Sequence, residues 1–491
     1  MALLLDRRGD QITITEEVVK AATGNWQNGK EVMALLLDRR GDQITITEEV
    51  VKAAAGNEGN GEEVMALLLD RRGDQITITE EVVKAAAGNG GNGKEVIALL
   101  LDRRGDEITI TEEVVKAAAG NWQNGKEVMA LLLDRRGDQI TITEEVVKAA
   151  AGNSRNGKEV MALLLDLRGD QITITEEVVK AAAENEWNGE EVMELLLDRR
   201  GDQITVTEEV VKAATENSRN GKEVMELLLD RRGDRITVTE KMVKTIAERF
   251  PSEIMTRLLD RRGDQITITE EVVKAAAGNG GNGKEVIALL LDRRGDEITI
   301  TEEVVKAAAG NEWNSEEVME LLLDRRRDQI TITEEVVKAA AENEENGKEV
   351  MALLLDRRGD QITITEEVVK AAAGNEGNGK EVIALLLDRR GDEIIINEEV
   401  VKAAATCGQD QVLDMLSQQT FRIEEEWRCI AQFYNAAKAG DVWTIKEMIQ
   451  QGVKPDVKNI RGETPLWIAA GLGHNTVVKL LAQRRDVDVN S

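Results

Sequence analysis

The sequence of 491 residues has little of what most enzymes and metalloproteins need. It contains one histidine, His474, and two cysteines, Cys407 and Cys429. A hydrolytic triad, a histidine-rich metal site or a histidine general base would each have to use that single histidine. Two cysteines cannot form a disulfide framework, and such frameworks are typical of secreted proteins. We therefore predict a cytoplasmic protein that is not an enzyme and that holds no metal and no cofactor.

Aromatic residues and long apolar segments are also scarce. Aromatics make up 2% of the chain against 42% for all hydrophobic residues, so a buried core must be aliphatic. The longest apolar run, residues 96–101, has six residues, whereas a bilayer span needs about 20. The N-terminus has neither a basic start nor a long apolar stretch, so it does not resemble a signal peptide. We therefore predict no membrane partner.

Positive charge is in deficit. The chain has 63 Lys and Arg against 93 Asp and Glu, which gives a net charge of −30. Residues 401–491 hold 11 basic and 11 acidic side chains, so residues 1–400, with 52 basic against 82 acidic, carry the whole excess. Because so acidic a surface repels phosphate backbones, we predict no nucleic-acid partner and expect a basic protein partner instead.

An internal repeat fills most of the chain. The string Leu-Leu-Leu-Asp-Arg-Arg-Gly-Asp ends at Asp10 and recurs, with single substitutions, every 32 residues up to Asp392, except for one interval of 30 residues. Self-similarity at such a period indicates a stack of small structural units. We predict that residues 1–405 form one tandem array.

One unit, residues 11–42, predicts a short extended piece followed by two helices. Its first residues alternate apolar and polar side chains, and Thr15 is placed to cap the first helix. A Gly- and Asn-rich turn at residues 24–29 separates the helices, and Asn28 is placed to cap the second. Gly41 follows the last turn, where we expect it to stop the helix in a left-handed conformation.

Neither helix can bury its apolar face alone, whereas stacked copies can. This predicts a mainly α, elongated repeat solenoid of two-helix units with short extended corners. Helices pack about 8–10 Å apart and paired strands about 4.8 Å apart. The corners should therefore not form one continuous parallel ladder.

The regular pattern is broken at two places. Residues 248–253 read Glu-Arg-Phe-Pro-Ser-Glu, lack the Asn-Gly turn and contain Pro251, which predicts a local change of curvature. Residues 1–5 correspond to residues 33–37 of the next unit, so the chain starts inside a second helix. We expect it to be an incomplete part of a longer solenoid.

The C-terminal segment has a different pattern. Residues 462–470 read Gly-Glu-Thr-Pro-Leu-Trp-Ile-Ala-Ala, followed by Gly473-His474 and by Val-Val-Lys-Leu-Leu at residues 477–481. This segment resembles an ankyrin repeat in which Trp467 replaces the usual histidine. Residues 432–458 resemble a degenerate preceding repeat. We therefore predict ankyrin repeats over residues 432–491, joined to the array by a transition segment, residues 406–431.

The combination of the array with ankyrin repeats is similar to fungal ankyrin-repeat and NOD-like receptor proteins. The resemblance implies a region that binds partners. One hypothesis is a non-catalytic scaffold that mediates protein–protein interaction through an extended acidic surface. The alternative is the ligand-sensing region of an innate-immunity-like receptor whose effector or nucleotide-binding module is absent from this chain.

Gly-rich segments of the array resemble a nucleotide-binding motif. Residues 88–94 match the spacing of a phosphate-binding loop. That loop needs a preceding strand and a Ser or Thr after its Lys, but a helical segment precedes residues 88–94 and Glu95 follows them. We interpret the segment as an inter-helix turn.

The units differ mainly at two central positions of this turn. Four of the five aromatic residues of the array are Trp residues there. Exposed turns can tolerate any residue, but Trp is the residue most enriched at binding hot spots. Their spacing suits an extended protein segment better than a small molecule, which needs a pocket. The candidate partner-binding residues are Trp26, Gln27, Trp122, Gln123, Arg155, Trp187, Arg219 and Trp313.

Overall fold

The structure, a computed structural model, describes residues 13–418 and 424–489. Residues 1–5, where we expect the chain to start inside a helix, lie outside these ranges. The chain divides into two compact units, one comprising residues up to 242 with 257–265, the other 243–256 with 266–491. Each unit is described by itself.

The first unit consists of a regular alternation of shorter and longer helices. The first helices of its repeats are α2 Glu16–Thr23, α4 Glu48–Ala55, α6 Glu80–Gly88, α8 Glu112–Ala119, α10 Glu144–Ala151, α12 Glu176–Glu184 and α14 Glu208–Glu216. The second helices are α3 Gly29–Arg40, α5 Gly61–Arg72, α7 Gly93–Arg104, α9 Gly125–Arg136, α11 Gly157–Arg168, α13 Gly189–Arg200 and α15 Gly221–Arg232.

The second unit continues the alternation and ends in the C-terminal helices. Its array helices are α18 Glu270–Ala277, α19 Gly283–Arg294, α20 Glu302–Ala309, α21 Ser315–Arg325, α22 Glu334–Glu342, α23 Gly347–Arg358, α24 Glu366–Gly374, α25 Gly379–Arg390, α26 Glu398–Thr406 and α27 Asp410–Ser417. The C-terminal helices are α28 Glu425–Ala439, α29 Val442–Gln450, α30 Pro465–Gly471 and α31 Asn475–Ala482.

Two further helices, α16 Glu240–Arg249 and α17 Ser252–Arg262, lie where the two units divide. They belong to the repeat that lacks the Asn-Gly turn. Pro251 immediately precedes α17, and Phe250 is buried at the end of α16. The change of curvature expected here stays a prediction.

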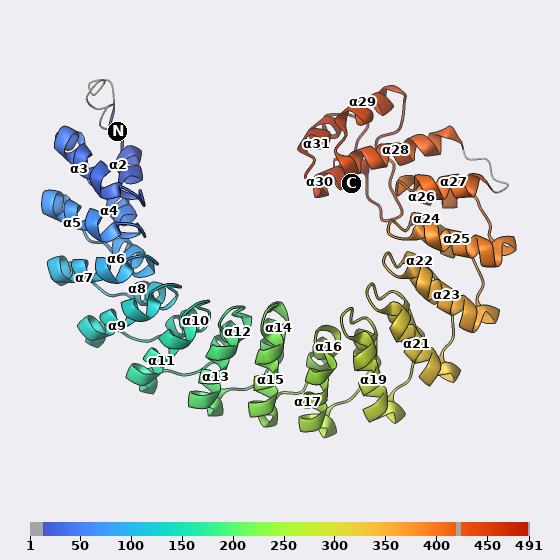
Figure 1. Cartoon of the computed structure of the whole chain (residues 1–491), viewed down its shortest axis with the longest axis horizontal. Coiled ribbons are helices and arrows are strands. Elements are labelled where there is room, and N and C mark those ends of the chain that lie inside the picture. The colour runs from blue at the N-terminus through green and yellow to red at the C-terminus, as the bar shows by residue number, and fades with distance from the viewer. Residues whose placement is uncertain (1–12, 419–423, 490–491) are drawn as a thin grey trace. The chain divides into compact units, whose positions relative to one another are not determined.

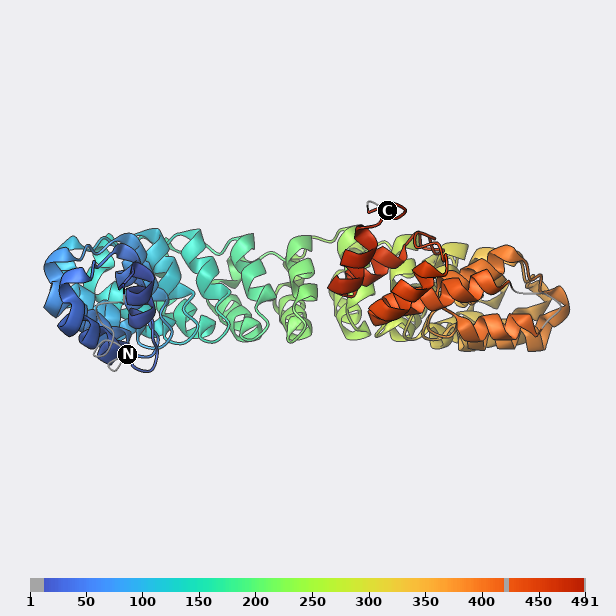
Figure 2. The same ribbon diagram turned by 90° about the horizontal axis from the view of Figure 1, so that it is seen from above.

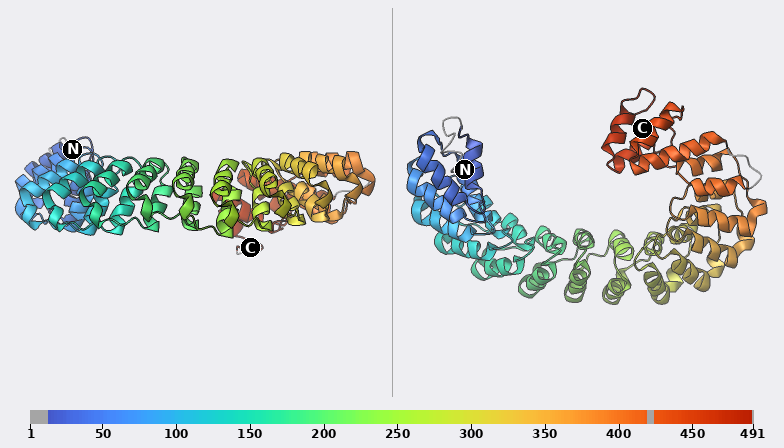
Figure 3. Two further views of the ribbon diagram at one scale, coloured as in Figure 1. Left: turned by 90° about the horizontal axis from the view of Figure 1, so that it is seen from below. Right: turned by 45° about the horizontal axis from the view of Figure 1, so that its top comes forward.

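Within each unit the helices form two layers (Figure 1). Each first helix packs on the first helix of the next repeat, as α4 packs on α6, and the second helices form the other layer. Figure 2 shows neighbouring repeats side by side, and the right view of Figure 3 shows both layers. In the second unit α26 packs on α28 and α28 on α30, so the layer of first helices continues into the C-terminal repeats.

The core between the layers is aliphatic, as the composition predicts. From α4 to α25, except in the irregular repeat of α16 and α17, each repeat buries two Val and two or more Ala of its first helix together with Val, Met or Ile, and Leu of its second. In one repeat these residues are Val146, Val147, Ala150, Ala151, Val160, Met161 and Leu164. Their 3.6-residue spacing places them on one face of each helix, and burying that face drives the stacking.

The Arg-Gly-Asp corner differs from the expected left-handed stop. Gly41 has φ −56° and ψ −33°, which is right-handed, and it begins the 3₁₀ helix η2 Gly41–Gln43. The equivalent position of a later repeat is Arg327, a residue that a left-handed position would disfavour. The prediction for Gly41 is therefore wrong, because the chain continues as a tighter helix and needs no left-handed residue there.

The extended corners do not form a sheet, as predicted. In the described residues the only bridge between them is a single parallel one, between Val206 and Ile236. Their isoleucines instead point into the core, as Ile172 and Ile174 do. Helix packing sets a spacing between repeats that is too wide for strand pairing.

The C-terminal helices form two ankyrin-like helix pairs. Thr464 is fully buried and its side chain accepts a hydrogen bond from Trp467 N–H at the start of α30. His474 Nε2 lies 2.8 Å from the carbonyl oxygen of Lys438, which ties one pair to the other. The mainly α solenoid ending in ankyrin repeats is thus confirmed. The domain boundaries at residues 405 and 431 stay a prediction.

Within residues 13–418 and 424–489, no helix has the length and apolar character that a bilayer span requires.

Candidate functional site

The candidate site is the row of turns between the first and second helices of the repeats. Each regular turn has the form Asn-X-X-Asn-Gly, and the two X positions are the variable ones. Residues 88–94 are such a turn, since α6 ends at Gly88 and α7 begins at Gly93. The interpretation of this segment as an inter-helix turn is therefore confirmed.

The first asparagine of each regular turn from Asn57 onward is buried and bonded across repeats, whereas Asn25 of the first turn is exposed. Asn153 is 3% exposed, and its Nδ2 donates to the carbonyl oxygens of Ala119 and Asn121, both at 2.9 Å. Its Oδ1 accepts the N–H groups of Arg155 and Asn156, both at 3.2 Å. One side chain thus closes its own turn and holds the preceding one. Buried and satisfied amides of this kind specify geometry because leaving them unpaired is costly.

The same residue forms a ladder through both units. We call the asparagine ladder the set of buried first asparagines whose Nδ2 atoms donate to carbonyl oxygens of the preceding repeat. Its members are Asn57, Asn89, Asn121, Asn153, Asn185, Asn217, Asn279, Asn311, Asn343 and Asn375.

The second asparagine and the glycine complete the turn. Asn28, expected to cap its helix, has no side-chain capping bond, and in later repeats this amide reaches the preceding turn instead, as Asn156 Nδ2 reaches Trp122 O at 3.1 Å. A Cβ on Gly157 would lie 2.9 Å from Ala150 O, so the glycine provides space where the helices meet.

Thr15 was expected to cap the first helix with its side chain. It occupies the N-cap position but makes no side-chain capping bond. In the next repeat the equivalent Thr47 donates to the carboxylate of Glu16, 2.6 Å away. The hydroxyl therefore links successive repeats. A hydrogen bond to an ionised carboxylate is stronger than one between neutral groups.

The four tryptophans all project into solvent from these turns. Trp26, Trp122, Trp187 and Trp313 are 65%, 39%, 61% and 69% exposed. Their positions are nonetheless set by the backbone: the N–H of Trp313 donates to the buried Asn311 Oδ1 at 3.1 Å, and that of Trp187 to Asn185 Oδ1 at 3.3 Å. The turns therefore hold exposed rings on a fixed backbone.

The other candidate residues occupy the second variable position. Gln27 and Gln123 are exposed, and their N–H groups donate to Asn25 and Asn121. Arg155 and Arg219, in contrast, reach back to the preceding turn. The Arg155 guanidinium carbon lies 4.5 Å from the ring centre of Trp122, and that of Arg219 lies 3.4 Å from the ring centre of Trp187.

Negative charge is dense beside the turns. Burial, together with the carboxylates of Glu191 and Glu223, raises the pKa of Glu190 at the start of α13. Repulsion between neighbouring carboxylates favours the neutral form of each. A cationic partner would relieve this repulsion.

In the second unit the C-terminal repeats themselves contact the turns. Lys438 Nζ lies 2.7 Å from a carboxylate oxygen of Glu376, and the Arg461 guanidinium pairs with Glu344. Between these ion pairs the side chain of Ile460 lies over Gly374. Glu376 and Glu344 occupy the first variable positions of two successive turns, so the turns bind basic side chains from elsewhere in the chain.

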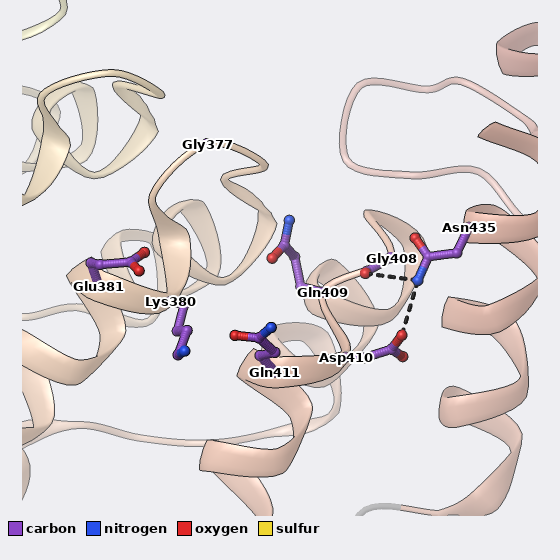
Figure 4. Close-up of a pocket in the computed structure, with 8 residues that line it drawn as sticks. All are labelled: Gly377, Lys380, Glu381, Gly408, Gln409, Asp410, Gln411 and Asn435. Carbon is purple, nitrogen blue, oxygen red and sulfur yellow. Dashed lines mark hydrogen bonds between the residues drawn. The ribbon is translucent and has the colours of Figure 1, made fainter. Parts of the chain in front are cut away.

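A polar hollow of about 360 Å³ lies where the array meets α28 (Figure 4). Asn435 Nδ2 donates to Gly408 O at 3.1 Å and to Asp410 Oδ2 at 2.9 Å. Burial raises the pKa of Asp410. Cys407, 32 residues after Asn375, takes the ladder position here, and burial raises its pKa to about 11. In this hollow Asn435 of α28 is thus hydrogen-bonded to the end of the array at Gly408 and Asp410.

The sequence analysis missed the asparagine ladder and the two Arg–Trp stacks. The ladder leaves a signal, because an asparagine recurs at the repeat period beside positions that vary. The stacks leave a weaker one: Arg219 follows Trp187 by 32 residues and Arg155 follows Trp122 by 33. Among the described residues, Trp26 and Trp313 have no such cation over the ring.

Comparison with known proteins identifies the repeats. A family described as "Domain of unknown function (DUF7104)" matches residues 3–33, 35–65, 67–96, 99–129, 131–161, 163–193, 195–225, 227–249, 258–286, 289–319, 321–351, 353–382 and 385–406. A family described as "Ankyrin repeats (3 copies)" matches residues 433–491. No curated protein matches the chain.

Solved structures of other helical repeat proteins also match. Two are crystal structures of the pentatricopeptide repeat protein PPR10, one of them a cysteine-to-serine variant, each in complex with an 18-nt psaJ RNA element. In both cases the identity is 14%, the TM-score is 0.40, and the match covers 92% of this chain and 72% of the other.

These structures contradict the exclusion of nucleic acid as a partner. Both matched structures hold RNA, so the prediction of no nucleic-acid partner is wrong as an exclusion. The physical reason is that net charge sums over a whole surface, whereas a phosphate backbone senses the local charge of one groove. At this TM-score the likeness does not assign RNA binding to this chain.

The identity of the chain rests on the family matches, which agree with the repeat period, the two-helix units and the C-terminal helix pairs described above. The DUF7104 matches extend over more than half of the chain. The chain therefore belongs to the DUF7104 family, a family of unknown function, and continues from these repeats into ankyrin repeats.

Proposed function

We propose that the chain is a non-catalytic scaffold that binds a protein partner along the row of inter-helix turns. The observation that carries the proposal is the set of four exposed tryptophans at variable positions of the turns. The turns of Trp122, Trp187 and Trp313 are each held by a buried asparagine. A ring that is already ordered loses little conformational entropy on binding, and Trp is the residue most enriched at interface hot spots.

The charge of the array supports a basic partner. The excess of acidic residues creates a field that attracts positively charged segments and raises their rate of encounter. Two turn glutamates already accept a lysine and an arginine from the C-terminal repeats. Binding should weaken with salt, because the screening length falls from about 10 Å at 0.1 M to about 3 Å at 1 M.

The test compares three forms of the full chain as bait in a lysate of its own source. They are the wild type, a variant with Trp26, Trp122, Trp187 and Trp313 replaced by Ala, and a control in which four exposed corner residues away from the turns, Gln43, Gln75, Gln139 and Gln361, are replaced by Ala. A protein retained by the wild type is then purified and its affinity for each form is measured. Truncating one anchoring Trp typically costs about 2 kcal/mol, or about thirtyfold in affinity.

We expect the tryptophan variant to lose the purified partner, the control to keep it, and all three to share one helical circular dichroism spectrum. Equal affinity of the tryptophan variant and the wild type would refute the proposal. Retention that disappears after nuclease treatment, with no protein binding directly, would replace the protein partner by RNA.

A further inference from the structure

Two of the four turn tryptophans already carry an arginine of the chain itself. In the first unit Arg219, at the second variable position of its turn, stacks on Trp187, at the second variable position of the turn before. Arg155 stacks on Trp122 in a similar way. These pairs show that the Trp rings of this row can bind a guanidinium group, because a guanidinium stacks favourably on the face of an indole.

Trp313, in the second unit, has the same position in its turn as Trp187 but a different neighbour. The residue 32 positions later is Glu345, which is exposed. No cation covers the Trp313 ring in the described part of the chain, and 69% of the residue is exposed. The position that holds an arginine in one unit therefore holds a carboxylate in the other.

The surroundings of Trp313 leave room for a side chain. Its ring leans over Gly280, where an added Cβ would lie 2.8 Å from Trp313 Cδ1. The ring borders a hollow of about 520 Å³ with the Gly280–Gly281 turn, Glu248 and Arg249. Arg249 pairs with Glu248 at 3.2 Å, so the cation that is already present has its own partner.

Carboxylates occupy both the turn of Trp313 and the turn that follows it. Glu312 precedes Trp313 in its turn and is exposed, and Glu345 lies in the following turn. Glu344, beside Glu345, binds Arg461 from the C-terminal repeats. An arginine brought to this turn thus meets both an indole face and a carboxylate.

We propose that Trp313, the Gly280–Gly281 hollow and the carboxylates of Glu312 and Glu345 form a binding site for an arginine side chain on an extended segment of a protein partner. This inference rests on the proposed function and names the partner chemistry of one turn. Trp26 is likewise uncovered. We choose Trp313 because its ring borders the hollow beside Gly280 and Gly281.

The test uses the full chain labelled with 5-fluorotryptophan, so that ¹⁹F NMR reports each ring separately. The probe is the peptide acetyl-Gly-Ser-Arg-Ser-Gly-amide, and the matched control peptide carries citrulline, which keeps the planar shape of arginine without its charge. Single Trp→Phe variants assign the signals. We expect the arginine peptide to shift the Trp313 signal, the citrulline peptide not to shift it, and the Trp122 and Trp187 signals to stay unchanged.

Two substitutions make the inference sharper. Glu345→Arg should place a guanidinium over Trp313, as Arg219 lies over Trp187, and weaken peptide binding at Trp313 by about fivefold or more. Glu345→Gln removes the carboxylate without adding a cation, so it should weaken the Trp313 response less than Glu345→Arg does. Conversely, Arg219→Ala should uncover Trp187 and make its signal respond to the peptide.

The inference is overturned if the citrulline peptide shifts Trp313 as strongly as the arginine peptide, or if Glu345→Arg, folded by circular dichroism, leaves the response unchanged. Either result leaves the proposed function standing if the four-Trp variant still loses its purified protein partner. Loss of the proposed function itself would appear in that separate measurement.

Discussion

The array and the ankyrin repeats are both stacks of two-helix units, but they join neighbouring units by different means. In the array a buried asparagine, such as Asn153, donates from one turn to two carbonyl oxygens of the turn before. In the ankyrin repeats the ring of His474 contacts the carbonyl oxygen of Lys438, and the hydroxyl of Tyr434 donates to Glu463 O at 3.1 Å. Neighbouring units are thus joined by the same asparagine amide in every regular repeat of the array from Asn57 onward, and by different individual side chains in the ankyrin repeats.

Glycine shows the same contrast. In the described residues the glycines with positive φ are Gly408, between α26 and α27, and Gly440, Gly452, Gly462 and Gly473 in the ankyrin repeats. The glycines of the array have φ values that other residues adopt, and some of them are needed because a Cβ would meet a neighbouring helix. The same residue therefore provides space in the array and backbone freedom in the ankyrin repeats.

The largest effect on this comparison should come from removing one member of the asparagine ladder. Asn153→Ala leaves two carbonyl oxygens and two N–H groups without the partner they have now, and we expect a loss of about 3 kcal/mol in local stability. Because a long repeat array need not unfold in one step, the measurement is hydrogen exchange of the amides in α8 and α10.

Its control is Ser154→Ala at the adjacent variable position, which should change protection in these helices by less than about 0.5 kcal/mol. Equal protection in Asn153→Ala and in Ser154→Ala would mean that helix packing alone joins the repeats. The contrast with the ankyrin repeats would then disappear.

A smaller effect is expected from adding a methyl group where the array lacks space. Gly157→Ala places a Cβ 2.9 Å from Ala150 O, and such overpacking costs about 1–3 kcal/mol. Gly73→Ala is its control, because nothing lies within 4 Å of the new Cβ and φ is −56°; it should be neutral or stabilising by about 0.5 kcal/mol. Thermal unfolding that ranks the two variants in the opposite order would contradict the packing argument.

The smallest effect tests backbone freedom in the ankyrin repeats. Gly440 has φ +71°, so Gly440→Ala should cost about 1–2 kcal/mol through the left-handed conformation, and its Cβ would also lie 2.7 Å from His474 Nδ1. Gly471→Ala, with no atom near its Cβ and no positive φ, is the control. If urea unfolding of the two variants coincides, conformation does not explain the glycine at position 440.

Much of the fold could be predicted from the sequence. The period of 32 residues defines the units, and the spacing of Val, Ala and Leu defines which helix faces are buried, because these signals are local. The prediction for Gly41 was wrong because it used only a local signal. A glycine after a helix is usually left-handed, but the structure shows that the chain continues into η2.

The candidate site was predictable in part. The variable positions and their tryptophans stand out in the sequence, whereas the ladder at Asn153 depends on contacts between residues 32 and 34 positions apart. The stack of Arg219 on Trp187 likewise depends on the approach of two turns, which no local pattern reports.

Sequence periodicity alone was sufficient to specify the repeat unit and the aliphatic core, since each follows from which side chains must leave water together. The ankyrin-like end was identified by its resemblance to a known repeat. Tertiary contact alone specified which tryptophans are covered. Trp187 and Trp313 occupy the same position in their turns. Arg219 covers the face of the Trp187 ring, whereas the residue at the equivalent position after Trp313 is Glu345, which supplies no cation. The physical reason is that an exposed ring takes its environment from the next repeat, and that neighbour is set by how closely the helices stack.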